Sequence, residues 1–169
     1  MNPEHMAIRS GLKADLAQLT DLYNHYVQTS PATFDIEQQS MDARREWMSH
    51  YSLHGPHRLF VAALDDRILG FASSSRLAAR PAYARAVETS VYVRFDAVGR
   101  GVGTRLYTVL FEALASEAVH RAYAQVTLPN PASVALHRRF GFHEIGLQHE
   151  VGHKFGRYWS VQLFEKHLN

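Results

Sequence analysis

Three glycines join a strand-like segment to a long amphipathic segment, and this junction limits the possible folds more than any other part of the chain. The segment "VETSVYV" (87–93) is rich in β-branched residues, and residues 101–117 carry apolar side chains at helical spacing. Between them, Gly99, Gly101 and Gly103 allow the backbone to approach an anion closely. The free N–H groups of a first helical turn, with the helix dipole, also favour a phosphate. From the loop alone, a phosphate site and an exposed turn before an ordinary helix are equally good interpretations.

Two familiar phosphate loops do not fit this junction. A Walker A loop continues from its last glycine into Lys and then Ser or Thr, whereas here Thr104 and Arg105 follow the last glycine. A dinucleotide fingerprint spaces its glycines as G-x-G-x-x-G after a β-α-β unit. Here the third glycine comes one residue early, and the preceding segments read as a meander. The glycines alone therefore predict only a general anion-binding backbone.

The patterning predicts one domain of the α/β (α+β) class over residues 6–168, preceded by a disordered leader at residues 1–5. Strands are expected at 6–11, 58–64, 68–76, 87–93 and 122–127 and near 143–151 and 158–165, and helices at 13–30, 41–52, 101–117 and 130–140. The order β-α-α-β-β-β-α-β-α-β-β implies a mixed, mostly antiparallel central sheet with helices on both faces.

Composition excludes several classes of function. The chain has no cysteine, which rules out disulfides, thiolate metal sites and a cysteine nucleophile. Its net charge is only +2 and its Lys and Arg residues are scattered, so no nucleic-acid surface is indicated. No run approaches the ~18 apolar residues of a membrane span, and a cytoplasmic protein is the expectation.

Three histidines follow one another closely: His50, His54 and His57 form H-x3-H-x2-H. Pro56 breaks the helix before the third histidine, so we expect a solvated helix end and no metal site.

Several segments in a consistent order resemble the GCN5-related N-acetyltransferase (GNAT) superfamily. They are "VGRGVGT" (98–104), "NPASVALHRRFGF" (130–142), "LYNHYVQTSPATF" (22–34) and "VETSVYV". The chain is most similar to the branch that acetylates phosphinothricin or methionine sulfoximine, which confers resistance to these antibiotic and herbicide compounds. This resemblance implies the GNAT fold, acetyl-CoA as donor and a homodimer. The superfamily often has Gln or Arg three residues before Gly101, where this chain has Val98.

The resemblance also implies which residues bind acetyl-CoA. The backbone of Val91 and Val93 is expected to pair with the pantetheine amides, and the N–H groups of Gly99 to Thr104 are expected to hold the pyrophosphate. The full set is Val91, Tyr92, Val93, Gly99, Arg100, Gly101, Val102, Gly103, Thr104, Asn130 and Ser133.

Two side chains are predicted to move protons. Transfer of an acetyl group to an amine requires a neutral amine and a proton for the departing thiolate. Glu88 is expected on the same strand face as Ser90 and Tyr92, and the branch carries a glutamate at this point, so Glu88 is the predicted base. His137 falls where much of the superfamily has its tyrosine acid, and is predicted to donate the proton, with a role as base the second interpretation. Without the resemblance, each residue has a more common structural interpretation. Glu88 would be a solvent-facing or ion-paired glutamate on a strand, and His137 an incidental histidine on a capped core helix.

The acceptor site is predicted from the loop before the glutamate strand. Arg80 and Tyr83 stand where the branch places its acceptor-binding Arg and Tyr, and Phe34 is the predicted aromatic wall. An arginine suits a bidentate oxyanion clamp. The phosphinothricin enzymes have a lysine where this chain has Ala78, and the tail "VGHKFGRYW" is closer to relatives acting on methionine sulfoximine or sulfone.

The sequence therefore predicts an N-acetyltransferase for an amino acid or its analogue, acting by direct attack in a ternary complex. Two alternatives stay open: an acetyltransferase for protein N-termini or lysines, and a non-catalytic acyl-CoA-binding module.

Overall fold

The computed structural model describes residues 6–168, so the leader predicted at residues 1–5 lies outside the described residues. The strands are β1 (Ala7–Ser10), β2 (Arg58–Leu64), β3 (Arg67–Arg76), β4 (Ala86–Val93), β5 (Arg121–Thr127), β6 (His143–Lys154) and β7 (Arg157–His167). The helices are α1 (Leu16–Thr29), α2 (Met41–Ser49), α3 (Val102–Ala115) and α4 (Pro131–Arg139), with short 3-10 turns η2 (Lys13–Asp15), η3 (Pro81–Tyr83) and η4 (Phe95–Ala97).

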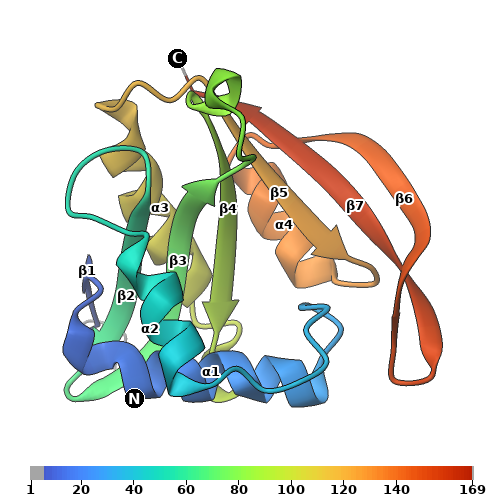
Figure 1. Ribbon diagram of the computed structural model, residues 1–169, viewed down its shortest axis with the longest axis horizontal. Helices are drawn as coiled ribbons and strands as arrows, with labels where there is room; N and C mark the ends of the chain where they lie inside the picture. Colours follow the sequence, from blue (N-terminus) through green and yellow to red (C-terminus); the bar gives the residue numbers. More distant parts are fainter. Residues whose placement is uncertain (1–5, 169) are drawn as a thin grey trace.

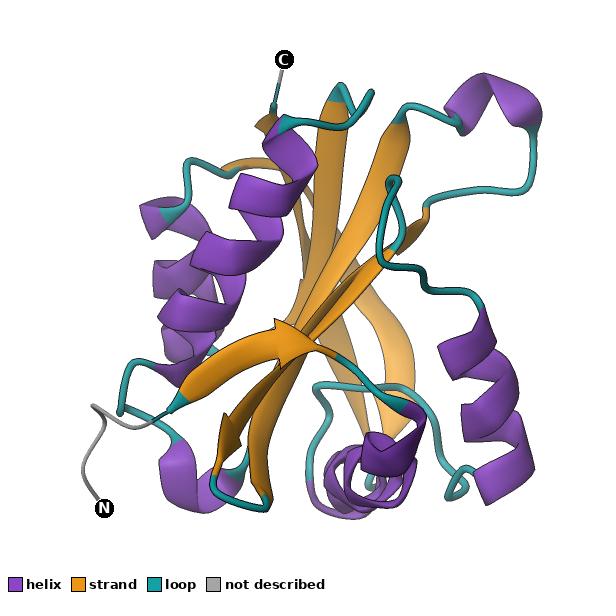
Figure 2. Ribbon diagram, turned by 90° about the vertical axis from the view of Figure 1, so that its left-hand side faces the viewer, coloured by secondary structure: helices purple, strands orange, loops and turns teal. Residues whose placement is uncertain are grey.

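The strands form one sheet in the order β1-β2-β3-β4-β5-β7-β6, with helices on both faces (Figures 1 and 2). β4 and β5 run parallel, and the other neighbouring strands are antiparallel. The predicted fold class and order of elements are confirmed. Within residues 6–168, no helix has the length and apolar character that crossing a membrane requires.

Alternation along the strands divides the core between the two faces. Phe60 and Ala62 of β2 pack with the cluster that contains α3, whereas Leu59 and Val61 pack with α1 and α2. Helix α3 buries a single stripe, formed by Leu106, Tyr107, Leu110 and Leu114. The sheet is thus covered on both sides, and β4 passes between the two clusters.

The terminal hairpin is longer than predicted. β6 and β7 continue to Lys154 and from Arg157, so only two residues, Phe155 and Gly156, form the turn. The ammonium group of Lys154 donates to the carbonyls of Ser30 and Thr33, at 2.9 and 2.8 Å. These contacts with the loop after α1 involve residues far apart in the sequence, which explains why local patterning predicted the strand end too early.

Candidate active site

Strands β4 and β5 pair only at their beginning, which leaves a wedge-shaped opening in the sheet. The parallel ladder between them ends at Glu88, whereas the ladder between β4 and β3 continues to Val93. The N–H of Arg94 donates to a carbonyl of β3. Because backbone direction alternates along a strand, the N–H and C=O groups of Val91 and Val93 point toward the opening. An extended ligand can therefore bind β4 as an additional strand would.

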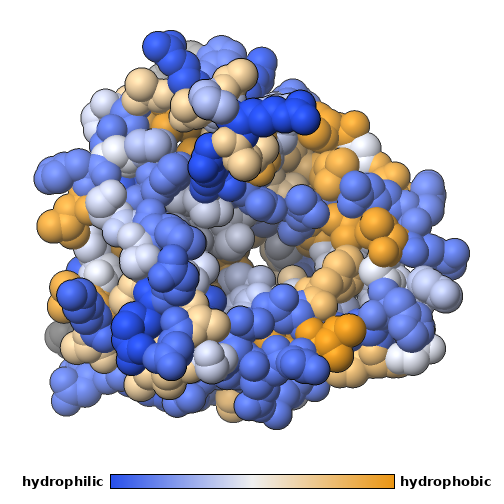
Figure 3. Space-filling model, in the orientation of Figure 1, coloured by the Kyte–Doolittle hydropathy of each residue, from blue (hydrophilic) through white to orange (hydrophobic). Residues whose placement is uncertain are grey.

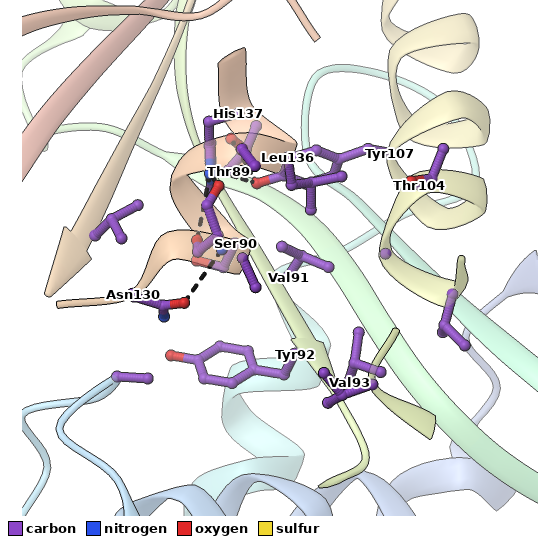
Figure 4. Close-up of a pocket in the computed structure, with 18 of the residues that line it drawn as sticks. Thr89, Ser90, Val91, Tyr92, Val93, Thr104, Tyr107, Asn130, Leu136 and His137 are labelled. Carbon is purple, nitrogen blue, oxygen red and sulfur yellow. Dashed lines mark hydrogen bonds between the residues drawn. The ribbon is translucent and has the colours of Figure 1, made fainter. Parts of the chain in front are cut away.

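A cavity of about 540 Å³, called the main cavity below, occupies this opening. It is bordered by β4, the start of α3, the end of β5 and α4 (Figure 4). The predicted site residues that line it are Glu88, Val91, Tyr92, Val93, Gly99, Gly101, Val102, Gly103, Thr104, Asn130, Ser133 and His137. Arg100 is exposed and is not among the lining residues.

The start of α3 presents unpaired N–H groups to the main cavity. Gly99 and Gly101 have φ angles of +79° and +77°, a backbone region that glycine adopts without strain. The N–H of Arg105 donates to the carbonyl of Gly101 at 3.0 Å, which starts the helical hydrogen-bond series. The N–H groups of residues 102–104 come before this bond and point out of the helix end. Together with the helix dipole they favour an anion.

Glu88 is half-buried on the face of β4 that carries Ser90 and Tyr92. Burial raises the pKa of the Glu88 carboxyl above its usual range. A carboxylate with a raised pKa is a stronger base once ionised, which is the property that deprotonation of an amine requires.

His137 is 3% exposed, and both of its ring nitrogens have partners. Nδ1 lies 2.8 Å from the backbone carbonyl of Ser133, and Nε2 lies 3.0 Å from the hydroxyl oxygen of Tyr107. Burial lowers the pKa of His137, which favours the neutral ring. A carbonyl only accepts, so Nδ1 carries the proton and Nε2 accepts from Tyr107.

Tyr107 belongs to the site, although the sequence analysis did not predict it. It lines the main cavity beside Leu136 and His137, and its hydroxyl lies 3.5 Å from Thr89 (Figure 4). In the sequence Tyr107 falls on the apolar face of a helix, where an aromatic residue usually belongs to the core. Its polar partner comes 30 residues later, so no local pattern links the two.

Asn130 caps the start of α4. The side-chain oxygen of Asn130 accepts from the N–H of Ser133 at 3.1 Å, and Pro131 is the first helical residue. This cap fixes the start of α4 beside the open edge of β4, and so fixes the position of His137 about two turns later.

The three predicted acceptor residues lie outside the lining of the main cavity. Arg80 is exposed at the start of η3, and Tyr83 at its end is 45% exposed. Phe34 is 38% exposed and packs against Gly152 of β6. Their roles stay predictions.

A second cavity of about 230 Å³ lies on the α1–α2 side of β4. It shares Ser90 and Tyr92 with the main cavity, so the two meet at this strand. Figure 3 shows a hollow near the centre of the molecule, with hydrophilic side chains on its left and hydrophobic side chains on its right.

The histidine-rich end of α2 has no metal-binding arrangement. Among residues 6–168, no group of three or more His, Cys, Asp or Glu side chains is placed to hold a metal ion. His50 instead lies 3.4 Å from Glu46, one helical turn before it.

Two curated relatives cover nearly the whole chain. Phosphinothricin N-acetyltransferase of Streptomyces coelicolor is 53% identical over 163 residues, which span 95% of each protein. L-methionine sulfoximine/L-methionine sulfone acetyltransferase of Pseudomonas paraeruginosa is 31% identical over 163 residues, or 96% of this chain and 95% of that protein.

Solved structures share the fold. A GNAT superfamily phosphinothricin acetyltransferase from Sinorhizobium meliloti, in complex with acetyl-CoA, superposes with a TM-score of 0.92 at 27% identity, covering 98% of this chain and 89% of that one. A ribosomal-protein-alanine N-acetyltransferase from Brucella melitensis gives a TM-score of 0.89 at 31% identity, covering 96% and 99%. Residues 19–142 match the Acetyltransferase (GNAT) family, and the chain belongs to this family.

Proposed function

We propose that this protein transfers the acetyl group of acetyl-CoA to the amine of an amino acid analogue such as phosphinothricin, methionine sulfoximine or methionine sulfone. The observation that carries the proposal is the main cavity, where an unpaired edge of β4, the free N–H groups of α3 and the carboxylate of Glu88 converge. The names of the Streptomyces and Pseudomonas relatives support the acceptor class, and the acetyl-CoA in the Sinorhizobium structure supports the donor.

The donor is expected to lie along the open edge of β4. The carbonyl of Val93 already accepts a hydrogen bond from the hydroxyl of Tyr26 at 2.6 Å. The N–H of Val93 and both groups of Val91 are then available to the pantetheine amides. The N–H groups from Gly99 to Thr104 hold the pyrophosphate. Val98 is 54% exposed and offers no polar side chain, so the phosphate contacts in this loop come from the backbone.

The reaction is a direct attack in a ternary complex. The amine nitrogen attacks the thioester carbon, Glu88 takes the amine proton directly or through a water, and the carbon–sulfur bond breaks. The thiolate receives its proton from the hydroxyl of Tyr107, and His137, when its ring is protonated, passes its Nε2 proton to that hydroxyl oxygen. Positioning of the two substrates provides most of the rate enhancement.

The amino acid acceptor is expected to extend from Glu88 toward the loop that carries Arg80 and Tyr83. Arg80 binds the α-carboxylate, since a guanidinium matches a carboxylate in bidentate geometry. Phe34 forms the apolar wall of the acceptor site. Because Ala78 replaces a lysine of the phosphinothricin enzymes, we expect an acceptor preference shifted toward the methionine analogues.

The protein is proposed to act as a homodimer. β6 is the last strand of the sheet, and its residues are exposed along most of its twelve-residue length. Exposed apolar side chains gather on this hairpin: Ile145, Leu147, Val151, Phe155 and Tyr158. Figure 3 shows hydrophobic side chains on the right-hand part of the face, where Figure 1 places β5 to β7. A second copy would cover this strand edge, and analytical ultracentrifugation tests the assembly.

We further propose that the enzyme works in the cytoplasm, where acetyl-CoA is available, as one acetyltransferase domain spanning residues 6–168. Acetylation would then protect the cell against phosphinothricin or a methionine analogue.

Release of free thiol from acetyl-CoA tests the proposal. The chain has no cysteine, so a thiol-reactive dye reports coenzyme A alone. Release is expected with phosphinothricin, methionine sulfoximine or methionine sulfone, and little with common amino acids. Glu88→Gln is expected to slow release at least about 100-fold while acetyl-CoA still binds. Release without dependence on Glu88 would refute the assigned base.

A peptide acceptor is the second candidate, favoured by the likeness to the Brucella ribosomal-protein-alanine N-acetyltransferase. A short peptide with an N-terminal alanine belongs in the same assay. If the peptide alone supports thiol release, the acceptor is a protein N-terminus and the small-molecule assignment is wrong.

A further inference from the structure

Arg44 of α2 is a buried cation that lines the second cavity. It is 4% exposed, and within residues 6–168 its Nε and Nη2 atoms have no hydrogen-bond partner. Its guanidinium carbon lies 3.6 Å from the centroid of the Trp47 ring and 4.5 Å from that of Tyr23. Aromatic faces therefore surround a charge that has no anionic partner.

The aromatic contacts do not compensate fully for burying this charge. An arginine side chain stays protonated in proteins, and removing an ion from water costs more than contact with ring faces returns. The carboxylate of Asp35 lines the same cavity but has other partners: its Oδ2 accepts from the Tyr23 hydroxyl at 2.8 Å and from the Gln39 amide at 3.0 Å. Among the described residues, Arg44 forms no ion pair within 4 Å. A buried, unpaired guanidinium in a cavity is the expected form of an anion site before its ligand binds.

The second cavity lies against β4, the strand that carries the proposed base Glu88. Its other polar lining includes Ser73, Ser75, Ser90 and the carboxylate of Asp35, and it shares Ser90 and Tyr92 with the main cavity. Glu88 and Tyr92 lie four residues apart on one strand face, about 13 Å at the usual strand rise. Arg44 lies near the Tyr92 end, since its guanidinium carbon is 5.9 Å from the ring of Phe71, the β3 residue opposite Tyr92. The base therefore lines the main cavity and the unpaired cation lines the second cavity, and the two cavities share the β4 residues Ser90 and Tyr92.

We propose that the second cavity binds an oxyanion at the end of the acceptor side chain and that Arg44 is the cation that recognises it. The proposal rests on the proposed function, because it places the acceptor amine at Glu88. An amino acid with a terminal phosphinate, plus a hydrogen bond of about 3 Å at each end, matches the length of this stretch of β4. Phosphinothricin carries such a phosphinate. Arg44 would then determine specificity by binding the far end of the acceptor, while Arg80 binds its α-carboxylate.

The test compares two acceptors of similar shape, phosphinothricin and norleucine, which lacks the oxyanion. Arg44→Met keeps the side-chain length and removes the charge. We expect kcat/KM for phosphinothricin to fall at least about ten-fold, as for the loss of a charged hydrogen bond, while the value for norleucine stays within about two-fold. Arg45→Met is the matched control, because this neighbouring arginine is exposed and pairs with Asp42. It should change neither value.

The melting temperature separates recognition by Arg44 from a structural role. If Arg44 is an unpaired buried charge, replacing it with an apolar side chain of similar size should leave the melting temperature unchanged or raise it. A variant that melts well below the wild type and loses both acceptors equally would overturn the proposal, as would an unchanged preference.

Calorimetric titration of phosphinothricin into the full chain with coenzyme A separates the subsite from the proposed function. If the wild type binds phosphinothricin at least ten-fold more tightly than Arg44→Met but releases no thiol from acetyl-CoA, the subsite stands and the proposed function fails. If the wild type acetylates phosphinothricin and both proteins bind it equally, the function stands and the subsite is wrong. Absence of binding to the wild type also overturns the subsite.

Discussion

The Nε2 atom of His137 lies 3.0 Å from the hydroxyl oxygen of Tyr107, and this hydrogen bond joins α4 to α3 behind the open edge of β4. Both side chains are buried, and their rings meet edge to face. Because Nδ1 donates to the carbonyl of Ser133, Nε2 has Tyr107 as its donor. Tyr107 and His137 therefore form one hydrogen-bonded unit, and removal of either hydrogen-bonding group should affect the other.

The substitution Tyr107→Phe tests this unit. It leaves Nε2 of His137 buried without a donor, so the free energy of unfolding should fall by about 1–3 kcal/mol. If the thiolate receives its proton through this hydroxyl, kcat should also fall at least about ten-fold, with acetyl-CoA affinity unchanged. Urea unfolding, thiol release and calorimetry measure the three quantities. Tyr158→Phe, at a 62% exposed tyrosine, is the control. Loss of stability with normal kcat would assign the pair a structural role only.

Glu88 should determine the acid side of the pH profile. A base acts when ionised, so kcat should fall as the pH decreases through the pKa of Glu88, which burial raises above its usual range. His137 acts as an acid only when protonated, and burial lowers its pKa, so its contribution should decline as the pH rises through that value. Glu88→Gln should lower kcat at least about 100-fold and remove the acid limb. An acid limb that persists in the residual activity of Glu88→Gln would assign the base elsewhere.

The parts of the site that the sequence predicted are those that local chemistry determines. Glycine at Gly99 and Gly101 indicates positive φ, and Asn130 followed by Pro131 indicates a helix start, because each effect involves only neighbouring residues. The edge of β4 was also predictable, since β-branched alternation marks the strand. What the alternation could not show is where β5 leaves β4, because that depends on how the whole sheet twists and diverges.

The parts that the sequence missed depend on distant contacts. Arg44 lies in a helix with many charged residues, where an arginine usually faces solvent, and only the packing of α2 against Tyr23 and Phe71 buries it. The length of the terminal hairpin likewise depends on Lys154 reaching the loop after α1. Such contacts override local propensity, which is why their sequence signals are weak.

Gly152 of β6 should control the position of Phe34. A Cβ atom at Gly152 would lie 2.2 Å from Cζ of the Phe34 ring, a distance that forces the ring or the hairpin to move. Since Phe34 is the proposed acceptor wall, Gly152→Ala should raise the KM for the acceptor at least about three-fold and leave the KM for acetyl-CoA unchanged. Steady-state kinetics with each substrate varied measure both values.

The double variant Gly152→Ala/Phe34→Ala provides the control for this clash. If the ring is the obstacle, adding Gly152→Ala to Phe34→Ala should have little further effect, so the two changes are strongly non-additive. Additive effects would mean that Gly152→Ala acts on the hairpin by another route.

Gly101 should be required for donor binding beyond its effect on stability. Alanine at a φ of +77° costs about 1–2 kcal/mol of backbone strain. Gly55, with a φ of +87°, is a matched control, because a Cβ atom at either glycine meets nothing within 4 Å. Both alanine variants should lose similar stability in urea unfolding. Only Gly101→Ala, which shifts the N–H groups of the α3 end, should weaken acetyl-CoA binding, by at least about five-fold in calorimetry. Equal acetyl-CoA affinity in the two variants would show that this loop does not bind the pyrophosphate.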